Sequence, residues 1–136
     1  MTHSTLSEPR VARYEVEVRV KAPLQRVWEA LIRDPNEWWP NDFHCAGPDS
    51  VVMIDPTPGG MFREVSKSGG LLWGTVIAVE APTKITFQGS LAPDWGGPAT
   101  SILTFTLEEQ GDRTVVKISD ALIGLITEGT MQRLEG

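Results

Sequence analysis

The sequence predicts a single α+β domain built on a curved antiparallel sheet of seven strands. Segments in which apolar residues recur with period two cover most of the chain, as expected for strands with one buried face. The turns between them are short and rich in glycine and proline, which favours consecutive antiparallel hairpins. Because a sheet of this size curls and must bury one face, helices are expected to cover it. The length of 136 residues fits one domain.

The first strand and two helices occupy the N-terminal third. Residues Tyr14–Val20 alternate apolar and charged side chains and follow a tail at residues 1–12. Leu24–Ile32 has apolar residues at i, i+3, i+4 and i+7, with Pro23 at its first turn, which predicts an amphipathic helix. A second, short helix is expected after Asp34 as N-cap, with Pro35 at its first position.

Six further strands are expected in the remainder of the chain. They are Ser50–Ile54, Met61–Ser66, Leu71–Glu80, Lys84–Gly89, Thr100–Glu109 and Thr114–Leu122. Residues 90–99, with two prolines and a tryptophan, form the one longer loop expected among them. Residues 123–136 predict a C-terminal helix that begins between Ile123 and Thr127 and is weakened by two glycines.

Charge and composition exclude several classes of function. Lys and Arg number 12 against 18 Asp and Glu, a net charge of −6, so we expect no nucleic acid partner. No window approaches the ~20 apolar residues that cross a bilayer, so no membrane insertion is expected. A single cysteine, Cys45, and a polar N-terminus indicate a cytoplasmic protein.

The residues that most often carry chemistry are few. His44 and Cys45 are adjacent, and adjacent side chains in a regular element point apart, so a catalytic Cys–His pair is not expected. His3 lies in the tail, which leaves one histidine in the body of the domain and no basis for a metal site. Nucleotide-binding glycine motifs are missing from the sequence. We therefore expect no cofactor and no conventional catalytic constellation.

The apolar parity of the strands defines an inward face. Its residues are Val16, Val18, Ile85, Phe87, Leu103, Phe105, Leu107, Val116 and Ile118. In two strands both parities are apolar, so Met53 and Trp73 can face either way. This face is either ordinary packed core or the wall of a ligand cavity, and periodicity does not distinguish them.

Two carboxylates share that inward parity. Glu64 follows Phe62, and Asp120 follows Ile118. A carboxylate against an apolar cavity has its pKa raised by desolvation and can act as a general acid or as a ligand anchor. The alternative for Asp120 is that its strand has already ended and the side chain is solvated.

Several short motifs together resemble the START-like, or SRPBCC, superfamily. They are Ala22-Pro23 before Val27–Leu31, then Pro58–Phe62, Gly74–Val76, Glu80–Pro82 and Ile85–Phe87. Their order is most similar to the branch named after the activator of the ATPase of a heat-shock protein. The resemblance implies a helix-grip fold, in which the C-terminal helix lies across the concave face of the sheet and leaves space for a ligand. This chain ends sooner than such proteins do, which implies a pocket that is more open or is covered by a second copy in a homodimer.

The resemblance also implies a set of ligand-binding residues. They are Trp28, Trp39, Phe43, Met53, Phe62, Glu64, Trp73, Phe87, Trp95, Leu103, Phe105 and Asp120. Trp38, Trp39, Phe43 and Trp95 would lie near the cavity mouth, where aromatic rings can contact a flat apolar ligand. Alternatively, the adjacent tryptophans Trp38 and Trp39 only anchor their short helix.

The sequence and the resemblance together suggest three alternative functions. The first is non-enzymatic binding of a small hydrophobic or amphipathic molecule between the sheet and the C-terminal helix. The second is a cyclase-like or hydratase-like enzyme that uses Glu64 or Asp120 for proton transfer. The third, suggested by the family name, is a co-chaperone of a heat-shock ATPase in the stress response. Fold resemblance does not choose among them.

Overall fold

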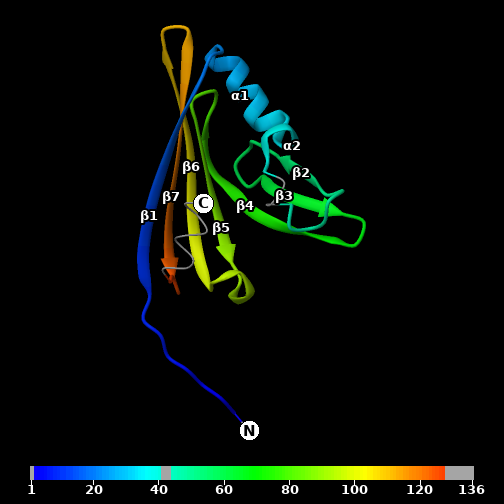
Figure 1. Cartoon of the computed structure of the whole chain (residues 1–136), viewed down its shortest axis with the longest axis vertical. Coiled ribbons are helices and arrows are strands. Elements are labelled where there is room, and N and C mark those ends of the chain that lie inside the picture. Colours follow the sequence, from blue (N-terminus) through cyan, green and yellow to red (C-terminus); the bar gives the residue numbers. More distant parts are fainter. Residues whose placement is uncertain (1, 41–43, 128–136) are drawn as a thin grey trace.

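The computed structural model describes residues 2–40 and 44–127 (Figure 1). One antiparallel sheet has the strand order β1-β7-β6-β5-β4-β3-β2. The elements are β1 (Arg10–Val20), α1 (Leu24–Arg33), α2 (Pro35–Trp38), β2 (Val51–Ile54), β3 (Met61–Ser66), β4 (Gly69–Glu80), β5 (Lys84–Leu91), the 3-10 helix η2 (Pro93–Trp95), β6 (Ala99–Gln110) and β7 (Arg113–Gly124). The predicted seven-stranded sheet with two short helices after the first strand is confirmed.

The main differences from the prediction lie at the ends of the sheet. β1 begins at Arg10, inside the expected tail, because residues 10–12 pair with the end of β7. β7 in turn continues to Gly124, which pairs with both Arg10 and Ala99. Residues 123–127 contain no helical residue, so the predicted start of a C-terminal helix between Ile123 and Thr127 is not observed. The remainder of that predicted helix, residues 128–136, lies outside the described residues.

The two helices follow the sequence closely. α1 buries Val27, Trp28 and Ile32 on one stripe, as the periodicity predicts. α2 has Pro35 at its first position. Asp34 occupies the N-cap position, but its side chain makes no capping bond, and its carbonyl instead accepts a hydrogen bond from the N–H of Glu37. Among the described residues, no helix is both long and apolar enough to cross a membrane.

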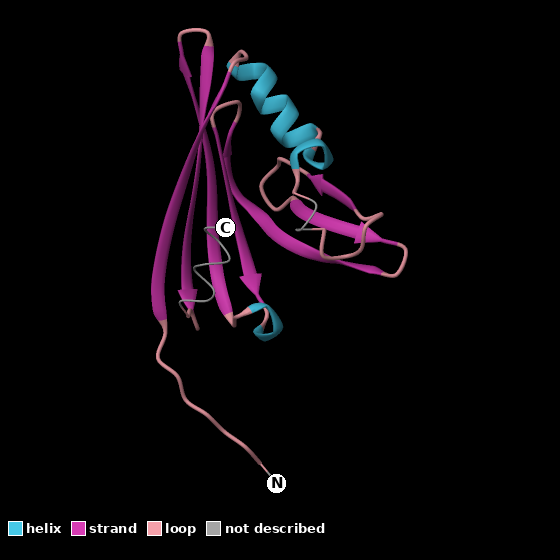
Figure 2. Cartoon of the chain, in the orientation of Figure 1, coloured by secondary structure: helices cyan, strands magenta, loops and turns pink. Residues whose placement is uncertain are grey.

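The sheet is strongly curved because two of its ladders are irregular. The register shifts between Phe62 and Arg63 in β3 and between Val76 and Ala78 in β4, and such bulges bend a strand and increase its twist. Glycine permits close contact at the bend, since a Cβ on Gly89 would lie 2.2 Å from the carbonyl oxygen of Trp73. β2 and β3 consequently turn away from the long strands β1, β6 and β7, with α1 on the concave side (Figure 2).

The core lies between α1 and this concave side. Its buried residues are Val27, Trp28, Ile32, Val52, Phe62, Val76, Ile85, Phe87, Phe105, Leu107 and Val116. Burial of each large apolar side chain contributes about 1.5–3 kcal/mol. The predicted inward parity of β5, β6 and β7 is confirmed by these positions.

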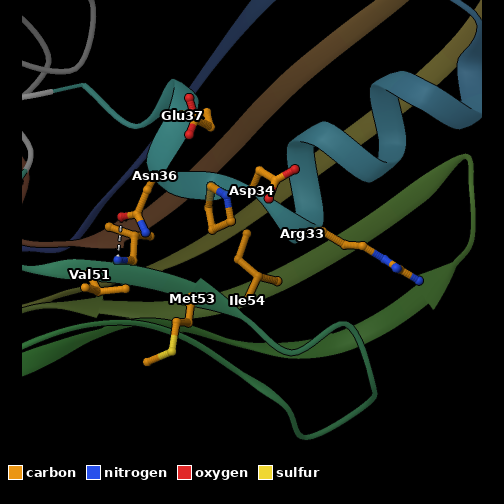
Figure 3. Close-up of a pocket in the computed structure, with 9 residues that line it drawn as sticks. Arg33, Asp34, Asn36, Glu37, Val51, Met53 and Ile54 are labelled. Carbon is orange, nitrogen blue, oxygen red and sulfur yellow. Dashed lines mark hydrogen bonds between the residues drawn. The ribbon is translucent and has the colours of Figure 1, made fainter.

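One edge of the sheet is protected by α2. The Asn36 side-chain oxygen accepts a hydrogen bond of 2.8 Å from the backbone N–H of Val52 in the edge strand β2 (Figure 3). A groove of about 420 Å³ lies between residues 33–37 and β2. Ile54 points toward α2 in this view, and Met53 points the opposite way (Figure 3). The capped N–H makes this edge a poorer template for pairing with another strand.

Candidate functional site

The ladder registers place residues of five strands in rows across the concave face. One row contains Tyr14, Asp120, Leu103, Phe87 and Val76, each paired with the next. The adjacent row contains Val16, Ile118, Phe105, Ile85 and Val79. Directly paired residues share a face of the sheet, so these side chains form a continuous floor. Within these rows the floor is apolar except at Tyr14 and Asp120.

Five aromatic side chains form a closed ring of contacts above and within this floor. Trp38 contacts Trp39 and Phe105, with ring centroids 5.6 and 6.2 Å apart. Phe62 contacts Trp39 and Phe87, both at 5.2 Å. Phe87 and Phe105 close the ring at 5.7 Å. Almost all these pairs are edge-to-face, the geometry that aromatic quadrupoles favour.

Two further tryptophans extend this ring to the surface. Trp73 lies 5.0 Å from Trp39 and stacks on Trp95 at 6.4 Å with an interplanar angle of 20°. Trp95, in η2, is 40% exposed, while Trp39 and Trp73 are half-buried. We call these seven residues the aromatic cluster: Trp38, Trp39, Phe62, Trp73, Phe87, Trp95 and Phe105.

Glu64 lies fully buried beside the aromatic cluster, on the predicted inward parity. Its Oε1 accepts a hydrogen bond from Trp73 Nε1 at 3.1 Å, and its Oε2 accepts bonds from Ser50 Oγ at 2.8 Å and the Ala46 N–H at 2.6 Å. Burial raises the pKa of Glu64, but these bonds and one from the Cys45 N–H outweigh it, so the pKa is lowered overall. The expectation of a raised pKa was therefore wrong, because donors from a distant loop satisfy the carboxylate.

The loop at residues 44–50 is held by this carboxylate. Ser50 donates its hydroxyl hydrogen to Glu64, so it accepts from His44 Nδ1, which lies 2.8 Å away. The His44 ring thus bonds to Ser50. Partial burial, and then the charge of Glu64, raise the pKa of the Cys45 thiol. Residues 2–40 and 44–127 contain no group of three His, Cys, Asp or Glu side chains that could hold a metal ion.

A second buried carboxylate, Asp120, lies in the interior of β7. It is 7% exposed, so the alternative that its strand has ended in solvent is wrong. Ser101 Oγ donates a 2.6 Å hydrogen bond to its Oδ1, and the Tyr14 hydroxyl also donates to it. Burial raises the pKa of Asp120, and the hydrogen bonds only partly offset this. The pKa of Tyr14 is raised as well, by burial and then by the charge of Asp120.

The floor is unevenly covered. Phe87 and Val76 are 1% exposed, whereas Val16 and Val18 in β1 are each 45% exposed. Leu103 and Ile118, which lie between these positions, are half-buried. We call Val16, Val18, Leu103 and Ile118 the open patch. It borders Phe105 of the aromatic cluster on one side and Asp120 on the other.

The structure brings together most of the residues predicted for the site. Phe62, Glu64, Trp73, Phe87, Phe105, Trp39 and Trp95 lie in or beside the aromatic cluster, with Leu103 and Asp120 on the same floor. Trp28, on the buried stripe of α1, is packed in the core. Met53 pairs with Arg63 and so faces away from Glu64, which pairs with Val52. Phe43 lies outside the described residues.

Four contributing residues were missed as site residues by the sequence analysis. They are Tyr14, Ser101, His44 and Ser50. Tyr14 has the inward parity of Val16, and Ser101 that of Leu103, so the strand pattern contained a signal for both. His44 and Ser50 lie in an irregular loop, where no periodicity reports orientation.

Comparison with known proteins identifies related folds. The family model described as "Activator of Hsp90 ATPase homolog 1-like protein" matches residues 21–132. A solved protein from Rhizobium leguminosarum is 23% identical, with 96% of this chain and 90% of that one covered and a TM-score of 0.67. Mll3558 from Rhizobium loti is 17% identical over 96% and 92% of the two chains, also with a TM-score of 0.67. CalU16 from Micromonospora echinospora is 19% identical over 92% and 74%, with a TM-score of 0.60.

At these low identities the structural likeness shows the fold alone. No curated protein matches the chain by sequence. The site itself must therefore supply the argument for function.

Proposed function

Because the chain belongs to the Activator of Hsp90 ATPase homolog 1-like family, within the START-like fold, we propose that it binds a small hydrophobic or amphipathic molecule on its concave face. Proteins of this fold commonly serve as scaffolds for ligand binding or for cyclase-like enzymes. Here the ligand would lie on the open patch against the aromatic cluster, and the protein would act as a binding protein without catalysis.

The observation that carries this proposal is a half-exposed apolar floor that adjoins the aromatic cluster at Phe105, on the same face of the sheet. Val16 and Val18 are each 45% exposed on the same face whose neighbouring positions form the core. Apolar surface of this kind gains about 25 cal/mol for each Å² removed from water. A ligand that covers the open patch therefore gains a favourable free energy of binding, because it buries apolar surface that the folded chain leaves exposed.

The tryptophans of the aromatic cluster suit a flat ligand. Trp39 and Trp73 are half-buried and already in edge contact, so their orientations are fixed before a ligand arrives. Each further aromatic contact with a ligand ring would contribute about 0.5–1.5 kcal/mol beyond the buried area. Trp95 is stacked on Trp73, so ligand binding against the aromatic cluster should change its surroundings and therefore its fluorescence.

Glu64 favours binding over the cyclase-like alternative. Its two oxygens accept hydrogen bonds from Trp73 Nε1, Ser50 Oγ and the Ala46 N–H, which occupy most of the acceptor capacity of a carboxylate. With its pKa lowered it is ionised at neutral pH and holds no proton to donate. We assign it the role of a positioning residue, which fixes the Trp73 indole and the loop at residues 44–50.

Native mass spectrometry of freshly purified protein, followed by thermal shift against a library of aromatic and aliphatic compounds, tests the proposal. At a hundredfold excess over its Kd, a ligand should stabilise the fold by about 2.7 kcal/mol. For a domain of this size that corresponds to a Tm increase on the order of 10 °C. If no molecule co-purifies with the protein and no compound raises its Tm, the apolar face is ordinary packed core and the proposal fails.

A further inference from the structure

Three polar side chains from three adjacent strands meet on the apolar floor. Tyr14 in β1 and Ser101 in β6 both donate their hydroxyl hydrogens to Asp120 in β7. We call these residues the Asp120 cluster. Asp120 is 7% exposed, while Tyr14 and Ser101 are half-buried. A buried polar group on a dry face requires an explanation, because its desolvation is costly.

Hydrogen-bond capacity distinguishes Asp120 from Glu64. A carboxylate offers about four acceptor positions. Asp120 accepts a hydrogen bond of 2.6 Å from Ser101 Oγ and interacts with the Tyr14 hydroxyl and the Ala121 N–H, whereas Glu64 accepts three hydrogen bonds of 2.6 to 3.1 Å. Among the described residues, Asp120 is therefore less fully satisfied than Glu64 and keeps acceptor capacity for a ligand. The raised pKa of Asp120 is consistent with a carboxylate that its surroundings satisfy only in part.

The Asp120 cluster presents hydrogen-bond acceptors, and no hydroxyl donors, to a ligand. Tyr14 and Ser101 give their only hydroxyl hydrogens to Asp120, so what remains on each is an oxygen lone pair. The partner that complements such a cluster is a hydrogen-bond donor. A donor that also carries positive charge offsets the cost of keeping the carboxylate ionised in a poorly solvated place.

The register sets the distance between this cluster and the aromatic rings. Leu103 pairs with Asp120 on one side and with Phe87 on the other. Neighbouring strands lie about 4.8 Å apart, so Asp120 and Phe87 are separated by roughly 10 Å. That span matches a flat bicyclic ring system with a polar group one carbon atom beyond its edge.

We propose that the Asp120 cluster is the polar subsite of the concave face and takes the hydroxyl or protonated amine of an amphipathic aromatic ligand. The inference rests on the proposed function and specifies its ligand class. The ring system lies over Leu103 toward Phe87, and its donor group uses the acceptor capacity that Asp120 keeps.

Four naphthalene compounds test this by isothermal titration calorimetry at pH 7. They are naphthalene, 2-naphthalenemethanol, 2-naphthylmethylamine and 2-naphthoate. A hydrogen bond to a charged group contributes about 1.5–3 kcal/mol, so the alcohol and the amine should bind roughly ten- to a hundredfold more tightly than naphthalene. The acceptor-only anion 2-naphthoate should bind more weakly than naphthalene.

The variant Asp120→Asn should reduce the affinity for the amine by at least tenfold while leaving that for naphthalene within a few-fold. Asp112→Asn is the matched control, because Asp112 is exposed in the turn between β6 and β7. Circular dichroism verifies folding, and Asp120→Ala, which also removes the carboxylate, replaces Asp120→Asn if that variant does not fold.

The possible results separate the two levels of the proposal. If none of the four compounds binds, the proposed function fails. If naphthalene binds but the alcohol and amine bind no better, or if Asp120→Asn leaves their advantage intact, the concave face is a ligand site and the polar subsite is refuted. The expected order of affinities, lost in Asp120→Asn and kept in Asp112→Asn, establishes the subsite.

Discussion

The buried carboxylate of Glu64 offers the sharpest test of how the aromatic cluster is held. Glu64→Gln preserves the shape of the side chain and removes its charge. Glutamine can keep its oxygen toward Ser50 and the Ala46 N–H, but its amide group then faces the Trp73 Nε1–H, donor against donor. The substitution thus deletes one bond and converts the others from charge-assisted to neutral.

The magnitude follows from those bonds. The lost bond to Trp73 is worth about 1.5–3 kcal/mol, and each of the two retained bonds weakens by about 1 kcal/mol when the acceptor becomes neutral. We therefore expect Glu64→Gln to lower the free energy of unfolding by about 3–5 kcal/mol at pH 7. Glu108→Gln is the control, because Glu108 is an exposed carboxylate in β6, and it should change stability by less than about 0.5 kcal/mol.

The same variant makes a prediction about pH. Since the folded-state pKa of Glu64 is lowered, its stabilisation is present above the unfolded pKa of about 4.3 and is lost as pH falls through the folded pKa. Glutamine does not titrate, so the stability gap between parent and variant should narrow below about pH 4.3. Urea unfolding followed by circular dichroism at pH 7 and at pH 3.5 measures both values. A gap below 1 kcal/mol at pH 7, or one that does not narrow in acid, would refute this account of Glu64.

Three further predictions concern single residues. Alkylation of Cys45 at pH 8 should be slower than in the urea-unfolded chain, because its raised pKa leaves less thiolate; equal rates would contradict the shift. Tyr14 is the only tyrosine, so absorbance at 295 nm reports it alone. Its ionisation should begin well above pH 10 and move to lower pH in Asp120→Asn, and an unchanged titration would exclude their contact. As pH rises from the unfolded pKa of about 10 towards the higher folded pKa, the fold should also lose stability, because the unfolded phenol ionises first. Asn36→Ala should cost about 1–3 kcal/mol in urea unfolding by leaving the buried Val52 N–H without its acceptor, and an unchanged stability would contradict this role of Asn36.

Much of the fold could be predicted because most strands have one solvent-facing side and one buried side. Polar and apolar residues therefore alternate along them. The pattern at Met61–Ser66 gave the observed bounds of β3, and the inward parity of Phe87, Phe105 and Val116 was correct. The pattern did not extend to strand ends such as Arg10 and Gly124, where pairing with neighbours, and not alternation, keeps the chain extended.

The site was less predictable because its partners come from irregular segments. Trp73 lies at a register shift in the β3–β4 ladder. There the alternation of residues no longer indicates which face of the sheet a side chain occupies. Glu64 had the right parity, but the donors that lower its pKa lie 14 to 18 residues away in the loop at residues 44–50 and 9 residues away in β4. Trp28 has the size and periodicity of a cavity residue, yet it packs in the core, which sequence pattern cannot distinguish from a pocket wall.

The affinity of naphthalene for three forms of the chain tests ligand binding on the concave face most directly. Leu103→Trp adds bulk to the open patch, between Asp120 and Phe87. Ile102→Trp makes the same kind of change on the opposite face of β6, at a residue that is also half-buried. Calorimetry should give the parent and Ile102→Trp the same Kd within a few-fold, and Leu103→Trp a Kd at least tenfold higher. Equal affinities for all three forms, or no binding by the parent, would contradict a ligand site on this face.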